Sequence, residues 1–263
     1  MSDNLTVILR TCKNSLLDQN LQNTNPSFVR ICGTDREEMI IKCFKSLLIT
    51  INNCIFPVSF HIFDDHSDNE FLDKLHLLLK QYNVNATIHN LEERGFNNSA
   101  YQQFKFAKKQ EGLVYIVEDD YLHDPNALSS MVTSFLYFTR RYQDQVVIFP
   151  FDCPFRYEQG REEPTVLFHD GERYWRHVTY TTFTMLTHSS VINQHYSVFK
   201  NLALNYPKVL EDDTINKLYK KLQPQKDERI LVFNPIPSLA YHLSYAEPAS
   251  IKSSQLSWKD LWN

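Results

Sequence analysis

The first half of the chain alternates between short apolar runs and longer stretches in which apolar residues recur every three or four positions. The short runs have the length of buried strands and lie at 5–9, 58–63, 86–89 and 113–117. The periodic stretches have helical spacing and begin near residues 35, 67, 98 and 124. Strands that alternate with helices predict an α/β fold, a three-layer α/β/α sandwich with a mostly parallel central sheet.

Polar residues mark where these helices are expected to start. Ser67 and Glu70 have the spacing of a capping box, and Asn98 precedes the next periodic stretch. Asp124 is followed by Pro125, which is favoured at the first position of a helix.

The second half of the chain is less regular. Apolar runs predict strands at 146–151, 165–168, 173–178, 182–187 and 229–233, and the spacing at 191–202 predicts a helix. The acidic triplet at 211–213 opens a further periodic stretch, and residues 234–263 are expected to form an irregular tail. We find no repeat, low-complexity tract or linker, so the pattern predicts one domain over 1–263.

Composition narrows the class of protein. The chain has 27 basic and 31 acidic residues and a net charge of −4, which does not favour a nucleic-acid partner. No run approaches the ~20 apolar residues of a transmembrane segment, and the N-terminus does not resemble a signal peptide. Five cysteines without a CxxC pair are expected to be reduced thiols, which favours a cytoplasmic location.

Glycine-rich phosphate loops are absent from the sequence. The chain has only five glycines, and neither GxGxxG nor GxxxxGK[ST] occurs. If a nucleotide binds, side chains and a metal ion must therefore hold it.

Two acidic clusters stand where predicted parallel strands end. Asp64 and Asp65 follow the run at 58–63, and Glu118, Asp119 and Asp120 follow the run at 113–117. Ligands bind at the carboxyl ends of the strands in such sheets, so both clusters are candidate site residues. Carboxylates suit Mg²⁺ or Mn²⁺, which would neutralise a diphosphate; a solvated acidic turn is the alternative interpretation.

Two later features have a functional and a structural interpretation. Glu211 and Asp212 either stabilise a helix N-terminus through its dipole or supply a general base. His242 is either a core histidine or a late metal ligand that reaches back to Asp120.

In this order, the motifs resemble those of the GT-A glycosyltransferases, specifically the family 2-like inverting enzymes. The resemblance is carried by "LTVILRTCKN", "DREEMIIKCFKSLL", "VSFHIFDDHSDN", "LVYIVEDDYLHDPNAL" and "VLEDDTIN". It spans about residues 5–220 and implies one GT-A-like domain. Residues 1–120 would bind the nucleotide sugar, 121–233 would bind the acceptor, and 234–263 would form the tail.

The resemblance also implies roles for individual residues. Asp212 would be the catalytic base, with Glu211 as the alternative, and Asp120 would bind the metal, with His242 as a further candidate ligand. The nucleotide sugar would contact Thr11, Asp64, Asp65, Arg94, Glu118 and Asp119. The aromatic and polar residues expected to meet the acceptor are Asp152, Trp175 and Arg176, for which an ordinary aromatic core is the alternative.

The sequence departs from the family pattern at three places. Residues 13–34 form a long insertion after the first strand, and the glycine-rich stretch expected before the late acidic motif is missing. No QxxRW motif occurs, so the chain does not resemble a processive polysaccharide synthase.

The implied reaction is a metal-dependent sugar transfer with inversion. The donor would be a UDP-, GDP- or dTDP-linked sugar, the metal Mn²⁺ or Mg²⁺, and the acceptor a glycan, a lipid-linked or another hydroxyl compound. Two alternatives remain at this point. One is a nucleotidyltransferase, which normally carries a glycine-rich signature near its N-terminus, and the other is a non-catalytic nucleotide- or sugar-binding module on the same fold.

Overall fold

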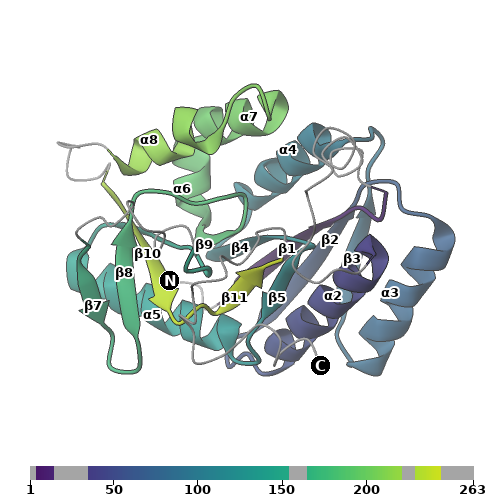
Figure 1. Cartoon of the computed structure of the whole chain (residues 1–263), viewed down its shortest axis with the longest axis horizontal. Coiled ribbons are helices and arrows are strands. Elements are labelled where there is room, and N and C mark those ends of the chain that lie inside the picture. Colours follow the sequence, from purple (N-terminus) through teal and green to yellow (C-terminus); the bar gives the residue numbers. More distant parts are fainter. Residues whose placement is uncertain (1–3, 15–34, 154–164, 221–228, 244–263) are drawn as a thin grey trace.

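A nine-stranded sheet runs through the whole protein in the order β3-β2-β1-β4-β9-β6-β10-β8-β7 (Figure 1). The computed structural model describes residues 4–14, 35–153, 165–220 and 229–243. The strands of this sheet are β1 (Leu5–Thr11), β2 (Val58–Asp64), β3 (Ala86–Asn90), β4 (Leu113–Glu118), β6 (Gln145–Ile148), β7 (Leu167–His169), β8 (Tyr174–Val178), β9 (Met185–His188) and β10 (Ile230–Ile236).

The predicted mostly parallel sheet is confirmed. Parallel pairing joins β3, β2, β1 and β4, and also joins β6 to β10. Strand β9 is antiparallel to both β4 and β6, and β8 is antiparallel to both β10 and β7. Only β9 and β8 therefore run against the common direction.

Helices cover both faces of the sheet and complete the predicted three layers. Figure 1 shows α2, α3 and α5 on one face and α4, α6, α7 and α8 on the other. Their bounds are α2 (Arg36–Asn52), α3 (Asn69–Gln81), α4 (Phe96–Ala107), α5 (Ala127–Tyr142), α6 (Ser189–Gln194), α7 (Tyr196–Asn205) and α8 (Ile215–Tyr219).

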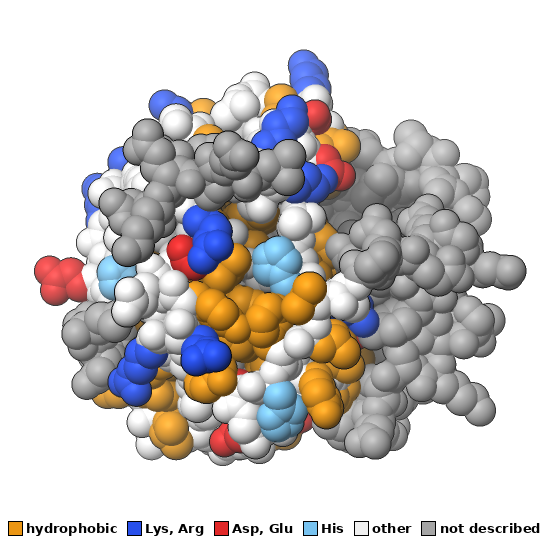
Figure 2. Space-filling view, turned by 90° about the vertical axis from the view of Figure 1, so that its left-hand side faces the viewer, with side chains coloured by type: hydrophobic (Ala, Val, Ile, Leu, Met, Phe, Trp, Pro, Cys, Tyr) orange, Lys and Arg blue, Asp and Glu red, His pale blue; other side chains and the backbone are white. Residues whose placement is uncertain are grey.

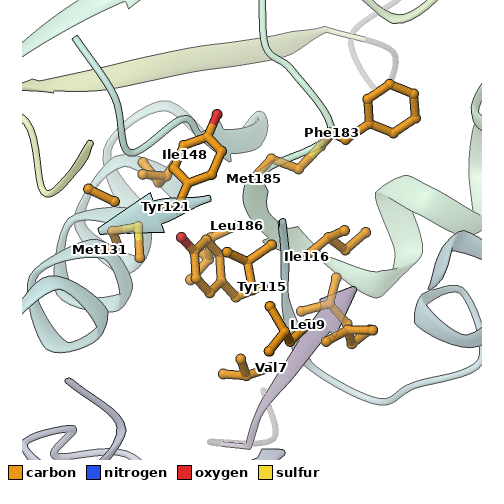
Figure 3. Packing of buried hydrophobic residues seen from close by; sticks show 14 of the residues in the cluster. Val7, Leu9, Tyr115, Ile116, Tyr121, Met131, Ile148, Phe183, Met185 and Leu186 are labelled. Atoms are coloured by element: carbon orange, nitrogen blue, oxygen red, sulfur yellow. The ribbon is translucent and has the colours of Figure 1, made fainter. Parts of the chain in front are cut away.

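The core lies where β1, β4 and β9 meet the helices. Figure 3 shows Leu9, Ile116 and Met185 from these three strands close together, and all three are at most 3% exposed. Strands buried on both faces explain why their sequences read as continuous apolar runs rather than as alternating ones.

Three helix starts differ from the sequence-based expectation. Helix α3 is capped by Asp68, whose carboxylate accepts a bond from the Phe71 amide, whereas the Ser67 hydroxyl accepts the Lys13 amide instead. Helix α4 begins after Gly95 rather than at Asn98, and α5 begins at Ala127, after Pro125. A long-range contact takes the Ser67 hydroxyl, whereas the Asn98 and Asp124 side chains bond the nearby Glu93 carbonyl and Asn126 amide.

The second half also differs in detail. The helix predicted over 191–202 is divided into α6 and α7 at His195. The acidic triplet forms a short 3₁₀ turn, η2 (Glu211–Asp213), ahead of α8.

The beginning of the predicted irregular tail is ordered as strands. Strand β10 continues to Ile236, and β11 (Ala240–His242) pairs antiparallel with β5 (Tyr121–His123) in a small second sheet. Residues 15–34 of the predicted insertion and 244–263 of the tail lie outside the described residues. No helix in the described part of the chain is long and apolar enough to cross a lipid bilayer.

Candidate functional site

The two acidic clusters meet at one edge of the sheet, as the sequence predicted. Strand β1 lies between β2 and β4, and its register places Thr11 opposite Asp64 and Arg10 opposite Glu118. The carboxyl ends of the three strands are therefore level, and the site is built on this edge.

Asp119 is held in place by bonds to both of its carboxylate oxygens. The Arg36 guanidinium donates to both oxygens at 2.9 Å, and the Thr11 hydroxyl and Cys12 amide donate to Oδ2 at 3.2 and 2.9 Å. Burial raises the pKa of Asp119, and the Arg36 charge opposes this rise. This network ties the acidic turn to β1 and to the first residue of α2; the predicted ribose contact of Asp119 stays untested.

Glu118 points to the opposite face of the sheet. It pairs with Arg10 at 2.5 Å, and the Arg10 guanidinium lies 4.0 Å above the centre of the Phe96 ring. Burial raises the pKa of Glu118 to about 7, while Arg10 opposes the rise and Asp120 adds to it. Glu118 and Asp119 therefore lie on opposite faces of the sheet, and each pairs with its own arginine. This separation explains why three adjacent carboxylates are tolerated.

Asp120 and His242 are in contact, although 122 positions separate them. The pairing of β11 with β5 brings His242 opposite Tyr121, and its ring stacks on Tyr121 with centroids 4.7 Å apart. His242 Nε2 lies 3.0 Å from Asp120 Oδ2. The expected approach of His242 to Asp120 is therefore present, while its role as a metal ligand stays a prediction.

The donor set of this pair fits a divalent cation bound jointly with a substrate. Within the described residues, no group of three or more His, Cys, Asp or Glu side chains is arranged to hold a metal ion. One carboxylate and one imidazole leave coordination positions for phosphate oxygens and water, as in many nucleotide-dependent sites. The imidazole favours Mn²⁺ over Mg²⁺, which prefers oxygen ligands throughout.

Asp64 and Asp65 are both buried but have different partners. Asp65 accepts the Gly95 amide at 2.9 and 3.0 Å, and Gly95 has a φ of +120° that L side chains rarely adopt. Asp64 Oδ2 accepts the Ser67 amide at 3.0 Å, but Oδ1 has no hydrogen-bond partner among the described residues. Burial raises the pKa of Asp64. A buried acceptor without a donor is a place where a ligand N–H or O–H would fit.

Arg94 stands beside this pair at the surface. It is exposed, and its guanidinium donates to the Asn14 carbonyl at 3.3 Å. The predicted contact with the nucleotide stays untested.

Glu211 and Asp212 face different surroundings in η2. Asp212 is 74% exposed, and its carboxylate pairs with Lys220 at 3.2 Å and accepts Asn216, contacts that lower its pKa. Burial raises the pKa of Glu211, and its charge in turn raises the pKa of Glu118. Glu211 is therefore the more buried member of the pair and the one whose charge acts on Glu118.

The three predicted acceptor residues lie on both faces of the sheet. Asp152 and Arg176 form a buried ion pair at 2.7 Å. Trp175 is fully buried, and its indole donates to Asp170 at 2.7 Å, so its ring has no exposed face to offer an acceptor. Because side chains alternate along a strand, Tyr174 shares the face of Arg176, and it is 55% exposed.

An exposed apolar surface surrounds Tyr174. Val166 and Leu167 are 60% and 51% exposed, and β7 pairs with β8 so that His169 stands opposite Tyr174. Figure 2 views the side of the molecule on which β7 and β8 lie and shows hydrophobic side chains gathered across its middle.

The structure adds four residues that sequence reasoning did not assign to the site: Arg10, Arg36, Gly95 and Phe96. Arg10 had a detectable signal, since it is a lone charge in an otherwise apolar strand. Gly95 was also detectable, as one of only five glycines and directly before a helix. Arg36 had no such signal in the sequence, because its partner Asp119 lies 83 positions away.

Comparison with solved structures found chains of similar architecture. One is Staphylococcus aureus TarS (residues 1–349) in complex with UDP-GlcNAc, with a TM-score of 0.48, 15% identity, and coverage of 92% of this chain and 61% of that chain. Another is the galactosyltransferase LgtC with donor and acceptor sugar analogues, with a TM-score of 0.44, 12% identity, and coverage of 86% and 72%.

A third is the mannosyltransferase PcManGT from Pyrobaculum calidifontis in complex with GDP-Man and Mn²⁺. Its TM-score is 0.40, with 11% identity and coverage of 72% of this chain and 46% of that chain. The chain spans 36% of a longer TarS structure. No family model and no curated protein matches the sequence.

Proposed function

We propose that this protein is a metal-dependent glycosyltransferase that moves a sugar from a nucleoside diphosphate donor to a hydroxyl acceptor with inversion. The observation that carries the proposal is the convergence of Asp64, Glu118, Asp120, Glu211 and His242 at one sheet edge. Residues from four separate parts of the sequence supply acceptors for a nucleoside, ligands for a cation and a candidate base.

The donor nucleoside is assigned to the Asp64 end of the site. Asp64 Oδ1 is the buried acceptor that a base N–H or ribose O–H would satisfy. Thr11 and Asp65 border it, since the Asp65 amide donates to the Thr11 carbonyl at 2.9 Å. Arg94, exposed at the entrance, is assigned to the diphosphate, for which a guanidinium is well suited. UDP, GDP and dTDP all meet these requirements.

Asp120 and His242 are assigned to the cation, with Mn²⁺ preferred. When bound, the cation would supply charge neutralisation for the leaving diphosphate. Tyr121 positions His242 by ring stacking, and its hydroxyl is held by Thr182 at 2.9 Å. Asp119 and Arg36 keep the turn that carries Asp120 against β1.

We assign the general base to Glu211 rather than to Asp212. A base must reach the acceptor proton near the reacting carbon, and the charge of Glu211 acts on Glu118 in the acidic turn. Its raised pKa makes it a stronger base once ionised, whereas the Asp212 carboxylate is engaged by Lys220. Glu211 would remove the acceptor proton as the hydroxyl attacks the anomeric carbon, and a single displacement inverts that centre.

The acceptor is assigned to the second half of the chain. Tyr174 takes the place first given to Trp175, because it offers an exposed ring on the same strand. Asp152 and Arg176 support that face as a buried pair. A cytoplasmic location remains part of the proposal.

Calorimetry with UDP, GDP and dTDP, and with CMP as a control ligand, tests the proposal. Each would be titrated with and without Mn²⁺ into the wild type, Asp120→Asn and Asp213→Asn. One diphosphate should bind with Mn²⁺, and Asp120→Asn should weaken it at least about tenfold. Asp213→Asn should bind like the wild type, since Asp213 is 59% exposed and pairs only with Lys217 in the described structure.

The outcomes separate the three functions. If no nucleotide binds, with or without Mn²⁺, the proposed transferase function is contradicted. Tight diphosphate binding without release of diphosphate from any sugar-linked donor would indicate a binding module. A nucleoside triphosphate bound more tightly than every diphosphate, with release of pyrophosphate, would indicate a nucleotidyltransferase.

A further inference from the structure

Helices α4 and α7 form a surface that lacks acidic residues. Residues 95–110 and 189–210, which contain α4, α6 and α7, include no Asp or Glu, although the chain has 31 of them. The same segments hold five lysines: Lys105, Lys108, Lys109, Lys200 and Lys208. These two segments therefore carry a net positive charge in a protein whose net charge is −4.

The two helices lie side by side and antiparallel (Figure 1). The Asn97 amide donates to the Tyr206 carbonyl at 2.8 Å at one end of the pair. At the other end, the Lys108 ammonium lies 3.6 Å from the centre of the Tyr196 ring. The lysines of both helices consequently belong to one continuous surface.

Two tyrosines stand among these lysines. The phenol groups of Tyr101 and Tyr196 hydrogen-bond to each other, and this bond lowers the pKa of Tyr101. Lys105 and Lys200 approach the Tyr101 ring at 5.7 and 6.0 Å. In these contacts the lysine ammonium groups lie over the tyrosine rings, a cation–π arrangement that holds the lysines on this surface.

The charges of this surface are not neutralised within the described structure. Among residues 4–14, 35–153, 165–220 and 229–243, Lys105, Lys108 and Lys200 form no ion pair with a carboxylate. By contrast, Lys13 and Lys74 each bridge two carboxylates on the other face of the sheet. The lysine surface therefore presents charges available to an external anion.

Apolar side chains are exposed on the same surface. Leu204 follows Lys200 by four positions, so both lie on one face of α7, and Leu204 is 42% exposed. Lysine, tyrosine and leucine together are the side chains of an interfacial helix surface, where charges meet headgroups and apolar groups enter the acyl boundary.

We propose that the α4–α7 surface binds peripherally to a membrane rich in anionic lipids. The lysines lie on two neighbouring antiparallel helices, and a flat array of anionic headgroups can contact both helices at once. The exposed leucine favours a lipid surface, where its side chain can be buried. A soluble polyanion offers no apolar region to bury it. Each lysine near such a surface strengthens binding about fivefold, so three lysines together strengthen it about a hundredfold.

Vesicle co-sedimentation of the full chain tests this proposal. The vesicles are equimolar phosphatidylcholine and phosphatidylglycerol, with pure phosphatidylcholine for comparison. The wild type should bind the anionic vesicles only, and the triple variant Lys105→Gln, Lys108→Gln, Lys200→Gln should bind about a hundredfold more weakly. High salt should release the wild type, because exposed charges are screened.

A matched triple variant removes the same charge elsewhere. Lys42→Gln, Lys45→Gln, Lys80→Gln, in α2 and α3 on the other face of the sheet, should bind the anionic vesicles like the wild type. Circular dichroism and thermal unfolding establish that both variants are folded. Absent binding by the wild type, equal binding to neutral vesicles, or an equal loss in both triple variants would overturn the proposal. Since no donor is present, the result is independent of the proposed sugar transfer.

Discussion

Arg36 decides the geometry of the acidic turn through a single side chain. Its planar guanidinium bonds both oxygens of Asp119, and its Nε donates to the Cys12 carbonyl at 2.8 Å. A charge as buried as Asp119, which is 8% exposed, needs such a partner to remain ionised. Because Asp120 is adjacent to Asp119, this contact also fixes the position of Asp120.

Arg36→Lys is expected to destabilise the protein although it keeps the charge. In arginine, Nη2 bonds both Asp119 oxygens while Nε bonds the Cys12 carbonyl, and the single ammonium of a lysine cannot reproduce this fixed pair of donors. The free energy of unfolding should fall by about 2 kcal/mol, measured by urea denaturation. Arg140→Lys, at an exposed position of α5, is the control and should change it little. Equal stability of Arg36→Lys and the wild type would show that the Asp119 contact does not hold the turn.

His123 is a neutral buried histidine beside the same turn. Its Nε2 lies 2.8 Å from the Tyr115 hydroxyl, and burial lowers its pKa to about 3. Its amide donates to the Ser46 hydroxyl at 2.9 Å, which ties β5 to α2. Since the unfolded chain takes up a proton near pH 6.5 and the folded chain does not, acid favours unfolding.

The stability of the wild type should therefore fall as the pH drops below about 6.5. One proton per molecule corresponds to about 1.4 kcal/mol for each pH unit until the folded pKa is approached. His123→Gln should lack this component in urea denaturation between about pH 7 and pH 5. The control variant His76→Gln, at an exposed position, should keep this pH-dependent component of stability. An unchanged slope in His123→Gln would show that this histidine is protonated in the folded protein.

At the level of elements, the acidic triplet shows how a short turn sorts neighbouring carboxylates. The 3₁₀ turn η2 leaves Glu211 the more buried residue, whose charge acts on Glu118, and leaves Asp212 paired with Lys220 and exposed to solvent. The sequence could not separate the two, because both positions are compatible with a helix N-terminus.

Glu211→Gln and Asp212→Asn form a matched pair of neutral substitutions. Glu211→Gln should lower kcat about a hundredfold or more and leave donor affinity unchanged, since it removes only the base. Asp212→Asn should retain most of the activity. The rate in the wild type should decline as the pH falls through the raised pKa of Glu211, whose protonated form is inactive. A severe loss in Asp212→Asn alone would return the base to Asp212.

At the scale of the whole molecule, the sheet makes both halves of the chain one structure. Strand β9, from the second half, lies between β4 and β6 and pairs with both. The ring of Phe104 in α4, from the first half, packs against Phe199 of α7, from the second half, with centroids 5.0 Å apart. The predicted nucleotide-binding half therefore shares its core with the predicted acceptor half.

The chain is accordingly expected to unfold in one cooperative transition. Tryptophan fluorescence, which includes the buried Trp175 in the second half, and far-ultraviolet circular dichroism should give the same midpoint in urea. Phe138→Ala should lower both midpoints together, with a loss of about 3 kcal/mol, while the neighbouring Tyr137→Ala, 40% exposed, should change them little. Two separate transitions would show that the halves are independent folding units.

Local pattern was sufficient for most strands of the large sheet, for most helices and for the edge at which the acidic clusters meet. Apolar runs of strand length and a period of 3.6 residues depend only on neighbours along the chain, whereas β5 and β11 form only by pairing with each other. The contacts that define the site depend instead on residues that are far apart in the sequence. Arg36 with Asp119, Gly95 with Asp65 and His242 with Asp120 join residues 30 to 122 positions apart. These pairs exist only once the strands are ordered, because hydrogen bonds depend on distances in space that no spacing along the chain specifies.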